Sequence, residues 1–331
     1  MNVFVTGGAG YIGSATAGAL LAAGHQVTVY DSLVSGHRRA VPDQATFIQA
    51  DLADRLALDA AIGAGGFDAV MHFAAFIEAG ESMADPGKYF YNNLALSLGL
   101  IDACAQARVQ RFVFSSSAAV YASSDEPLAE ESALGPASVY GQTKLMIEQV
   151  LEWYRRIGGL RYACLRYFNA AGAMPGRGED HQPESHLIPM VLRVALGQRQ
   201  TVSIYGTDYP TPDGTCIRDY IHIADLIDAH LLALDGLTDH DQLIYNLGNG
   251  EGYSVREVVE AARRVTGHAI PVSETARRPG DAPRLVASSA RIRDELGWSP
   301  KQPNLAQIIS SAWEWHRDSP HGYSNSESAT A

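Results

Sequence analysis

The sequence predicts an α/β fold in which a doubly wound parallel sheet is followed by a smaller mixed α/β lobe. In the first half, six short apolar runs alternate with segments of helical periodicity. After Asn169 the character changes, because Gly, Pro, His and charged residues dominate positions 172–185. A length of 331 residues and an apolar share of 46% are enough for a sizeable core with a second lobe.

The six predicted strands of the first half are short and rich in Val, Ile, Phe and Tyr. They lie at residues 2–5, 26–30, 46–49, 69–73, 111–115 and 162–166. Helices are predicted at 11–23, within 89–107, and at 137–157 behind Pro136. Because helices separate the strands, the sheet is expected to be parallel.

The second half contains fewer regular elements. We expect helices at 188–196 and 222–234, strands at 202–205 and 243–247, and a turn-rich segment at 207–215. Ser254-Val-Arg-Glu257 is a capping box that opens a helix to about residue 265, and a last helix runs to about residue 316. The chain therefore divides into a first domain (1–168), onto which part of 216–247 packs back, a second lobe (169–318) and a flexible tail (319–331).

Charge and cysteine usage exclude several classes of partner. The formal charge is −12, with 25 basic and 37 acidic residues and no basic block, which argues against a nucleic-acid or membrane-surface partner. Cys104, Cys164 and Cys216 are far apart, so neither disulfides nor a metal site is predicted, and reduced buried thiols are expected. With no apolar run of roughly 18 residues, and a first strand that leaves no room for a signal peptide, a cytoplasmic location is expected.

A glycine-rich turn lies between the first strand and the first helix. The string Thr6-Gly-Gly-Ala-Gly-Tyr-Ile-Gly13 places Gly7, Gly10 and Gly13 at the spacing of a nucleotide-binding turn. Such glycines let the backbone approach a pyrophosphate, which then faces the positive end of the helix that starts at Tyr11 and Ile12. A tight turn without a ligand is the alternative, but the strand–turn–helix context favours a Rossmann-type dinucleotide site.

Residues at the ends of the next strands fit the rest of a dinucleotide. Asp31 ends the second strand, where a carboxylate accepts from both ribose hydroxyls and repels a 2′-phosphate, so NAD is favoured over NADP. Asp51 and Leu52 follow the third strand and could bracket the adenine, although Asp51 could also be a helix N-cap. The remaining positions follow the fourth strand, where small residues let a cofactor pass: Phe73, Ala74 and Ala75, with His72 interpreted as a strand residue and not a ligand.

Tyr140 and Lys144 form the candidate catalytic pair. A spacing of four residues puts the phenol and the ammonium on one face of a helix. A nearby cation favours phenolate, so the tyrosine could act as a base near neutral pH. One hydroxyl of the string Ser115-Ser116-Ser117 could hydrogen-bond the same substrate oxygen, although a Ser-rich strand end is common. The predicted chemistry is proton removal from a hydroxyl coupled to hydride loss from its carbon.

Together these motifs resemble the extended short-chain dehydrogenase/reductase family, and within it the UDP-glucose (UDP-galactose) 4-epimerases. The similarity spans residues 1 to about 315, and the part around Arg218 is typical of nucleotide-sugar enzymes. The stretches that carry it are 6–13, His72-Phe-Ala-Ala75, Gly80-Glu-Ser82, 115–121, 140–144, Arg166-Tyr-Phe-Asn169, 205–208, Asp213-Gly-Thr-Cys-Ile-Arg-Asp-Tyr-Ile-His222 and Arg277-Arg-Pro-Gly-Asp281.

The resemblance implies roles for individual residues. Ser117, Tyr140 and Lys144 would be the catalytic trio, and Asn92, Ser115 and Tyr167 would join the residues beside NAD. Arg218 and Arg278 would hold the diphosphate, because guanidinium groups suit phosphates, and Asp281 would bind a ribose hydroxyl of the uridine. Without the resemblance, both arginines would be interpreted as surface ion-pair residues. The other implied substrate contacts are Phe168, Asn169, His186, Leu187, Ile204, Tyr205 and Tyr220.

Three positions depart from the family pattern. Ile77 stands where some members carry a Lys near the cofactor phosphates. His186 stands where an Asn is often found beside the diphosphate, so it is either a phosphate donor or a loop histidine. Leu285 occupies a position thought to gate the sugar pocket, where Tyr is associated with rejecting N-acetylated sugars and a small residue with accepting them. Leu is intermediate, so the sugar stays open.

The resemblance implies a redox-neutral isomerase that uses NAD to epimerise a UDP-hexose at C4 through a 4-keto sugar. Alternatives are a 4-epimerase of UDP-N-acetylhexosamines or UDP-pentoses and, from another class, a non-catalytic NAD(H)-sensing protein. Dehydratases and decarboxylases of the family place an acid after the strand-five Ser, whereas Ala118 and Ala119 stand here. A homodimer through the helices around 89–107 and 137–157 is also implied.

Overall fold

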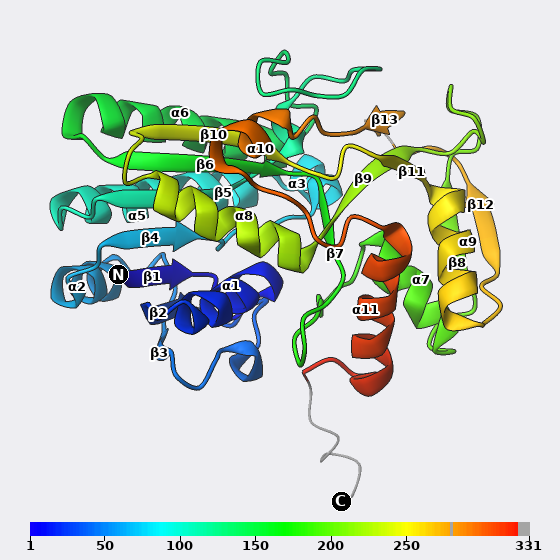
Figure 1. The fold of residues 1–331 in the computed structure, drawn as a ribbon, viewed down its shortest axis with the longest axis horizontal. Coiled ribbons are helices and arrows are strands. Elements are labelled where there is room, and N and C mark those ends of the chain that lie inside the picture. Colours follow the sequence, from blue (N-terminus) through cyan, green and yellow to red (C-terminus); the bar gives the residue numbers. More distant parts are fainter. Residues whose placement is uncertain (279–280, 324–331) are drawn as a thin grey trace, which may run out of the picture.

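The computed structural model describes residues 1–278 and 281–323. Its centre is a seven-stranded parallel sheet, which confirms the predicted doubly wound fold (Figure 1). The sheet holds the six predicted strands and one more, β10. In spatial order the strands are β10 (Gln242–Leu247), β6 (Arg161–Tyr167), β5 (Arg111–Ser117), β4 (Ala69–His72), β1 (Asn2–Thr6), β2 (Gln26–Asp31) and β3 (Thr46–Gln49).

Helices cover both faces of this sheet, because its strands are apolar on both sides. On one face, α1 (Tyr11–Ala22) and α8 (Ile223–Gly236) pack with the strands around Val5, Leu165 and Leu226. On the other face, α2 (Arg55–Gly65), α5 (Leu96–Gln106) and α6 (Val139–Gly158) pack around Phe4, Phe112 and Ile147. The sheet thus buries two separate cores, and the ends of its strands stay available for a site.

The single helix predicted within 89–107 is interrupted. The chain runs through α3 (Ala79–Ala84) and α4 (Pro86–Tyr89), then a π-helical turn, η2 (Phe90–Ala95), before α5 begins. Asn93 explains the change, because its amide bonds both backbone groups of Phe76, with N–O distances of 2.9 Å. A π turn widens the helix locally and is frequent at functional sites.

The second lobe is the smaller mixed α/β unit that the sequence predicted. Its core lies between α7, α9 and α11, around Val191, Val258 and Ile308, on the right of Figure 1. The predicted helices and the strand β8 are present, whereas the other strands of this lobe and the helix α10 were not predicted; in the first domain, α2 and α3 were not predicted. The elements of the second half not yet given are β7 (Asn169–Ala171), α7 (Leu187–Ala195), β8 (Val202–Tyr205), β9 (Ile217–His222), β11 (Gly252–Ser254), α9 (Val255–Thr266), β12 (Val272–Thr275), β13 (Arg284–Leu285), α10 (Ala290–Leu296) and α11 (Leu305–Asp318).

The chain leaves the first sheet after β6, builds part of the second lobe, and returns. β10 pairs with β6 in parallel register, Leu243 opposite Ala163 and Leu247 opposite Tyr167. Helix α8 precedes β10 and packs on the same sheet. The backbone therefore passes between the two parts of the molecule five times: after β6, before α8, after β10, before α10 and before α11.

Residues 319–323 of the predicted tail are packed against the protein. The backbone N–H of Tyr323 donates to Asp180 at 2.9 Å, and its ring lies 5.0 Å from that of His37 and 4.9 Å from that of Trp315. Residues 324–331 of the tail, and Pro279 and Gly280 of the stretch that ends at Asp281, lie outside the described residues. Within the described part, every helix is too short or too polar to cross a membrane.

Candidate active site

The glycine turn after β1 has the shape that a dinucleotide needs. Gly7 has φ +70°, and a Cβ there would lie 2.5 Å from the backbone nitrogen of Ala74. A Cβ at Gly13 would lie 2.2 Å from the carbonyl oxygen of Gly7. Gly10 is the N-cap of α1 and has no side chain to occupy the first-turn amides. These residues therefore fit a pyrophosphate at the helix N-terminus.

Asp31 ends β2 and is held by two backbone amides. Ala9 N–H donates to Oδ2 at 2.9 Å and Leu33 N–H to Oδ1 at 2.8 Å. Burial raises the pKa of this carboxyl, and the two amides oppose that effect. Each oxygen keeps a second lone pair, so the carboxylate can still accept from ribose hydroxyls.

Asp51 and Leu52 lie beyond β3, and the two side chains differ in exposure. Asp51 is exposed, and its Oδ1 accepts from Ala53 N–H at 2.8 Å. Leu52 is half-buried against the core on the α2 side of the sheet. An apolar contact and a carboxylate at the sheet edge suit an adenosine, as the sequence predicted.

Ser117, Tyr140 and Lys144 converge where β5 ends and α6 begins. Strand β5 continues to Ser117, two residues beyond its predicted end, and the hydroxyl oxygen of Ser117 accepts from the backbone N–H of Ala119 at 3.1 Å. Helix α6 begins at Val139, so Tyr140 lies in its first turn and Lys144 one turn later. A Cβ at Gly141 would lie 2.2 Å from the carbonyl oxygen of Ala119, so glycine lets the helix approach the turn that carries Ser117.

The electrostatics of this trio differ from the expectation. Lys144 Nζ donates to the carbonyl of Ser115 at 2.7 Å and lies 5.8 Å from the Tyr140 ring centroid. Burial raises the pKa of Tyr140, although the hydrogen bond from Ser117 lowers it. Burial also lowers the pKa of Lys144 to about 7. Desolvation therefore outweighs the predicted stabilisation of phenolate by Lys144, and the phenol is protonated in this state.

A buried polar network supports the trio from behind. Glu148, one turn after Lys144, accepts from Ser116 Oγ at 2.5 Å and pairs with Arg166 at 2.6 Å. Arg166 also donates to Tyr121 Oη at 2.9 Å, which in turn donates to Asn246 Oδ1 at 2.7 Å. The network joins β5, β6, β10 and α6, so it fixes the position of the helix relative to the strand end.

Other predicted cofactor residues line the strand ends. Phe73 and Tyr167 flank His230, with ring centroids 5.2 and 5.5 Å away, and Tyr167 donates to Ser115 Oγ. His72 is the last residue of β4, as predicted, and bonds Thr6 and Ser97 through its two ring nitrogens at 2.7 Å. Burial lowers the pKa of His72 to about 3.

Two further predicted cofactor residues, Asn92 and Tyr11, each donate a hydrogen bond to a neighbouring segment of the protein. Asn92 lies in the π-helical turn and donates to Asn93 Oδ1 at 3.0 Å. Tyr11 Oη donates to the carbonyl of Gly172 at 2.7 Å, which joins the glycine turn to the loop that follows β7. Ile12 is half-buried against the core on the α1 side of the sheet.

The predicted nucleotide-sugar residues form two pairs. Arg218, on β9, donates to Asp281 Oδ1 at 2.5 Å. The guanidinium of Arg278 lies 3.8 Å from the ring centroid of Tyr205. Arg218 is thus paired with Asp281, for which the resemblance implied a contact with the uridine ribose. A bound diphosphate would therefore compete with Asp281 for Arg218.

The remaining predicted substrate residues lie on the elements around these pairs. Asn169 Nδ2 donates to the carbonyl of Asp219 at 2.8 Å, and Tyr220 and Ile204 are buried. Phe168 and Leu285 are half-buried against one small cluster around Val120 and Leu128. The gate position is therefore close to the turn that carries Ser117.

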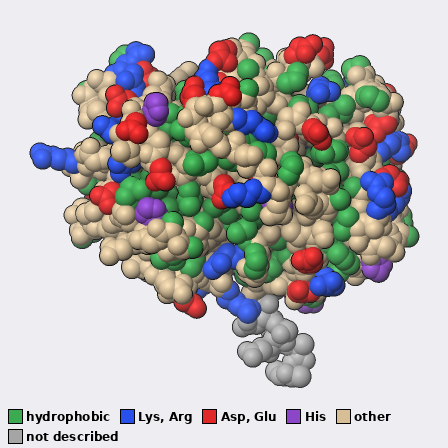
Figure 2. Space-filling model, viewed as in Figure 1, with side chains coloured by type: hydrophobic (Ala, Val, Ile, Leu, Met, Phe, Trp, Pro, Cys, Tyr) green, Lys and Arg blue, Asp and Glu red, His purple; other side chains and the backbone are tan. Residues whose placement is uncertain are grey.

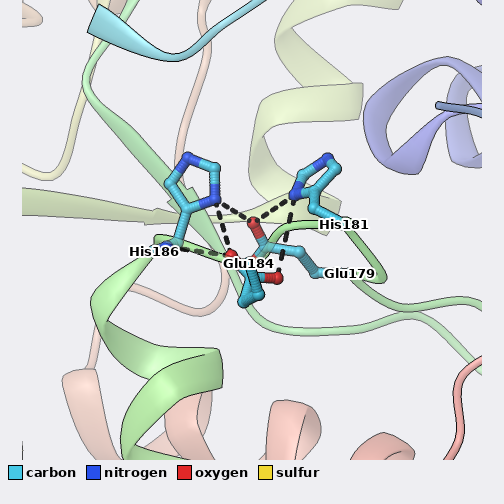
Figure 3. A group of neighbouring side chains, drawn as sticks. All are labelled: Glu179, His181, Glu184 and His186. Carbon is cyan, nitrogen blue, oxygen red and sulfur yellow. Dashed lines mark hydrogen bonds and ion pairs between the residues drawn. The ribbon is translucent and has the colours of Figure 1, made fainter. Parts of the chain in front are cut away.

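His186 lies in a cluster that the sequence did not predict. It is the N-cap of α7, directly before Leu187, and its Nδ1 lies 2.9 Å from Glu179 Oε1 and 3.1 Å from Glu184 Oε1 (Figure 3). Burial lowers the pKa of His186, but the two carboxylates outweigh that effect and raise it well above its usual value. The pattern Glu179-x-His181-x-x-Glu184-x-His186 is the signal that could have revealed the cluster.

Figure 2 shows acidic and basic side chains interspersed over the face that it draws.

Comparisons with known proteins agree with this geometry. A curated relative from Halalkalibacterium halodurans, named UDP-glucose 4-epimerase, is 50% identical over 328 residues and 98% of both chains. The UDP-glucose 4-epimerase of Brucella ovis, solved in complex with NAD, is 45% identical with a TM-score of 0.91, covering 95% of this chain and 97% of that one. The enzyme of Bifidobacterium longum, solved with NAD+ and UDP, is 35% identical with a TM-score of 0.93, covering 97% and 100%. The family model for the NAD dependent epimerase/dehydratase family matches residues 3–248, and the chain belongs to that family.

Proposed function

We propose that this protein is an isomerase that interconverts UDP-galactose and UDP-glucose by NAD-dependent epimerisation at C4. The observation that carries the proposal is the convergence of Ser117, at the end of β5, with Tyr140 and Lys144, one turn apart on α6, at the strand ends that also carry the glycine turn. The names of the relatives support the same reaction.

The residues that would hold NAD belong to the first domain. Gly7, Gly10 and Gly13 would accept the pyrophosphate, and Asp31 the adenosine ribose. When bound, NAD supplies a hydride acceptor and donor and one positive charge. The other residues that we assign to this site are Tyr11, Ile12, Asp51, Leu52, Phe73, Ala74, Ala75, Asn92, Ser115, Tyr140, Lys144 and Tyr167.

The chain's own groups would handle the proton. Tyr140 Oη would be the base for the sugar 4-hydroxyl in its ionised form, which the positive charges of Lys144 and of bound NAD would favour. Lys144, with a pKa lowered by burial to about 7, carries a partial positive charge at neutral pH and helps the phenol release its proton. Ser117 would hold the substrate oxygen during the transfer, and the same phenol would return the proton to the opposite C4 epimer.

The substrate lobe would bind the nucleotide firmly and the hexose loosely. Arg218 and Arg278 would meet the diphosphate, and Asp281 would exchange its ion pair with Arg218 for a ribose hydroxyl. Loose contact with the hexose lets the 4-keto sugar turn before it is reduced on its other face. The other residues assigned to this site are Phe168, Asn169, His186, Leu187, Ile204, Tyr205 and Tyr220.

Proton NMR of purified protein with UDP-galactose tests the reaction. Without added cofactor, or after adding NAD if none copurifies, we expect the anomeric signal of UDP-glucose to appear until equilibrium, without net accumulation of NADH. Parallel samples with UDP-N-acetylglucosamine and UDP-arabinose distinguish the alternative 4-epimerases. A protein that binds NAD but converts none of the three sugars would instead be an NAD(H)-sensing protein.

Leu285 offers a way to test sugar choice. Its side chain, like that of Phe168, packs against the cluster around Val120 beside the turn that carries Ser117, so a larger side chain there would narrow the proposed sugar pocket. We expect Leu285→Tyr to lower kcat/KM for UDP-N-acetylglucosamine more than for UDP-galactose, and Leu285→Gly to do the reverse.

We also propose a homodimer through α5 and α6. Apolar side chains project into solvent here: on α6, Trp153 is 59% and Ile157 82% exposed, and Leu98 on α5 and Tyr91 in the preceding turn η2 are also exposed. Exposed apolar patches of this kind mark protein interfaces. Light scattering after gel filtration should give a dimer mass for the wild type and a monomer mass for Trp153→Glu/Leu98→Glu. Leu56→Glu, on exposed α2, is the control that should stay dimeric.

A cytoplasmic location is our proposal as well. All three cysteines are buried thiols, and burial raises the pKa of Cys104 and of Cys164. Unpaired cysteines suit a reducing compartment.

A further inference from the structure

We propose that Glu179, His181, Glu184 and His186 form a structural site for a divalent transition-metal ion, with Zn²⁺ as the best match. The sequence predicted no metal, because the cluster contains no cysteine. The four side chains come from one loop, between β7 and α7, and converge on one point in Figure 3.

The spacing of the ligand atoms fits a tetrahedral ion. One oxygen or nitrogen atom from each residue lies within 4.8 Å of the other three. The four distances between histidine Nδ1 atoms and glutamate oxygens are 2.9, 3.1, 3.3 and 3.9 Å. Zn²⁺ bonds of about 2.0–2.1 Å in a tetrahedron place neighbouring ligand atoms roughly 3.3 Å apart. The histidine–glutamate spacings are therefore close to those around a tetrahedral ion, and the wider spacings in the group, up to 4.8 Å, would shorten on binding.

Within the described structure, Glu184 has a buried carboxylate oxygen that no hydrogen bond satisfies. Glu184 Oε1 accepts the backbone amides of Ser185 and His186 at 2.9 and 2.8 Å. Glu184 Oε2 is buried without a hydrogen-bond partner among the described residues, and it is directed toward His181. The side chain of Glu184 is fully buried. An unsatisfied carboxylate oxygen in that position is costly, and a cation would remove the cost.

The chemistry of the donors selects the class of ion. Two imidazole nitrogens and two carboxylate oxygens suit Zn²⁺, whereas Ca²⁺ and Mg²⁺ prefer oxygen ligands alone. Two buried carboxylates with neutral imidazoles carry two negative charges, which a divalent ion balances. Two protons on the imidazoles would balance the same charge, so protonated ion pairs are the competing occupant of the cluster.

The position of the cluster suggests what the ion would stabilise. The His181 ring lies edge-on to Tyr11, 6.5 Å between centroids, and Tyr11 belongs to the glycine turn. Ser185 donates to Glu78 at 2.7 Å, and Leu187 begins α7 in the substrate lobe. A closed set of four protein ligands leaves no position for substrate, so the ion would fix the loop between the two parts of the site and take no part in the chemistry.

Metal analysis of untagged protein tests the proposal. The protein is stripped with a chelator and dialysed against Zn²⁺, and its metal content is measured by mass spectrometry; a second stripped sample is titrated with Co²⁺. We expect close to one Zn²⁺ per chain and the intense visible absorption of tetrahedral Co²⁺. Because the readout is metal content, failure of the proposed epimerase reaction would leave this result unaffected.

Matched variants locate the ion. His181→Gln and Glu184→Gln should weaken Zn²⁺ binding by more than about tenfold, whereas His240→Gln, at an exposed position, should bind like the wild type. Circular dichroism checks that each variant is folded, and the Co²⁺ spectrum of the wild type tests the site without any variant. Stripped wild type that takes up neither ion, or a folded His181→Gln that takes up Zn²⁺ as tightly as the wild type, would overturn the proposal.

Discussion

The proposed catalytic wall, formed by β5 and α6 with Ser117, Tyr140 and Lys144, has a buried lysine, while its other two side chains are half-buried. The nucleotide grip, formed by Arg218 on β9 together with Arg278 and Asp281, leaves its charges partly open to solvent. Lys144 is 2% exposed, while Arg278 is classed among the exposed residues. The residues of the wall lie on the strand β5 and the long helix α6. Those of the grip lie on the strand β9 and on the loop between β12 and β13.

This difference matches two requirements of the proposed reaction. Proton transfer needs fixed geometry to within a fraction of an ångström, and a buried network supplies it. A ligand that must enter, stay bound by its nucleotide and leave needs charges that can exchange partners with water. Substitutions in the wall should therefore change kcat or folding, and substitutions in the grip should change KM.

The largest effect is expected at Tyr140. Tyr140→Phe removes the proton acceptor and keeps the ring, so kcat should fall by about 10²–10⁴-fold, with KM changed by less than about threefold. Steady-state turnover of UDP-galactose measures both constants. Tyr91→Phe, at an exposed tyrosine, is the control and should behave like the wild type. An unchanged kcat in Tyr140→Phe would show that Tyr140 is not the proton acceptor and that the wall does not carry out the proton transfer.

The second largest effect is expected at the buried pair behind the trio. Arg166→Met leaves Glu148 charged and unpaired in the core, which should cost about 3–5 kcal/mol of unfolding free energy. Urea denaturation measures this loss. Arg156→Met interrupts a half-exposed pair with Glu152 on the same helix and should cost less than about 1 kcal/mol. If both variants lost the same unfolding free energy, the buried ion pair would contribute no more to stability than the exposed one.

A pH-dependent effect is expected from His230, behind Phe73. Burial lowers its pKa from 6.5 to about 4, so the folded state keeps the neutral ring while the unfolded state binds a proton below pH 6.5. Stability is then lost as the pH falls from 6.5 toward 4, and between pH 7.5 and 5.0 the loss is about 2 kcal/mol. His230→Leu should reduce the measured loss by that amount, and His240→Leu should not. An identical pH profile in His230→Leu would contradict the assigned cause.

The smallest effect is expected in the grip. Arg278→Ala should raise KM for UDP-galactose roughly tenfold with kcat changed less than about threefold, because a solvated charge contributes to binding and not to the chemical step. Arg278→Lys should recover part of the loss. A fall in kcat larger than the rise in KM would break the comparison, since the arginine would then act on the reacting carbon.

The sequence predicted the sheet well because each strand is a short apolar run bounded by turns, as in Val3–Val5 and Phe112–Phe114. Apart from β8, the strands of the second lobe were missed because they have two to six residues and pair with distant segments, as Leu285 does with Arg218. Helix α2 escaped because its sequence, rich in Ala and Gly, buries only Leu58 and Ile62. Local pattern is informative where an element buries a full face, and weak where tertiary contacts define it.

The candidate site divides in the same way. The glycine turn and the Tyr140–Lys144 spacing are local, so the sequence contained them. The Arg218–Asp281 pair joins residues 63 positions apart, and the direction of Lys144 toward the Ser115 carbonyl depends on packing. The effect of desolvation on the pKa of Tyr140 could not be predicted, because spacing carries no information about depth.

The late return of β10 bears on how the protein is made. During synthesis, the outer edge of β6 has no partner strand until the ribosome has released β10, which follows β7, β8 and β9 in the chain. A nascent sheet with a bare edge is open to wrong partners. Truncated products that end before residue 242 should therefore depend on chaperones or aggregate, even though they contain every residue of the proposed catalytic trio.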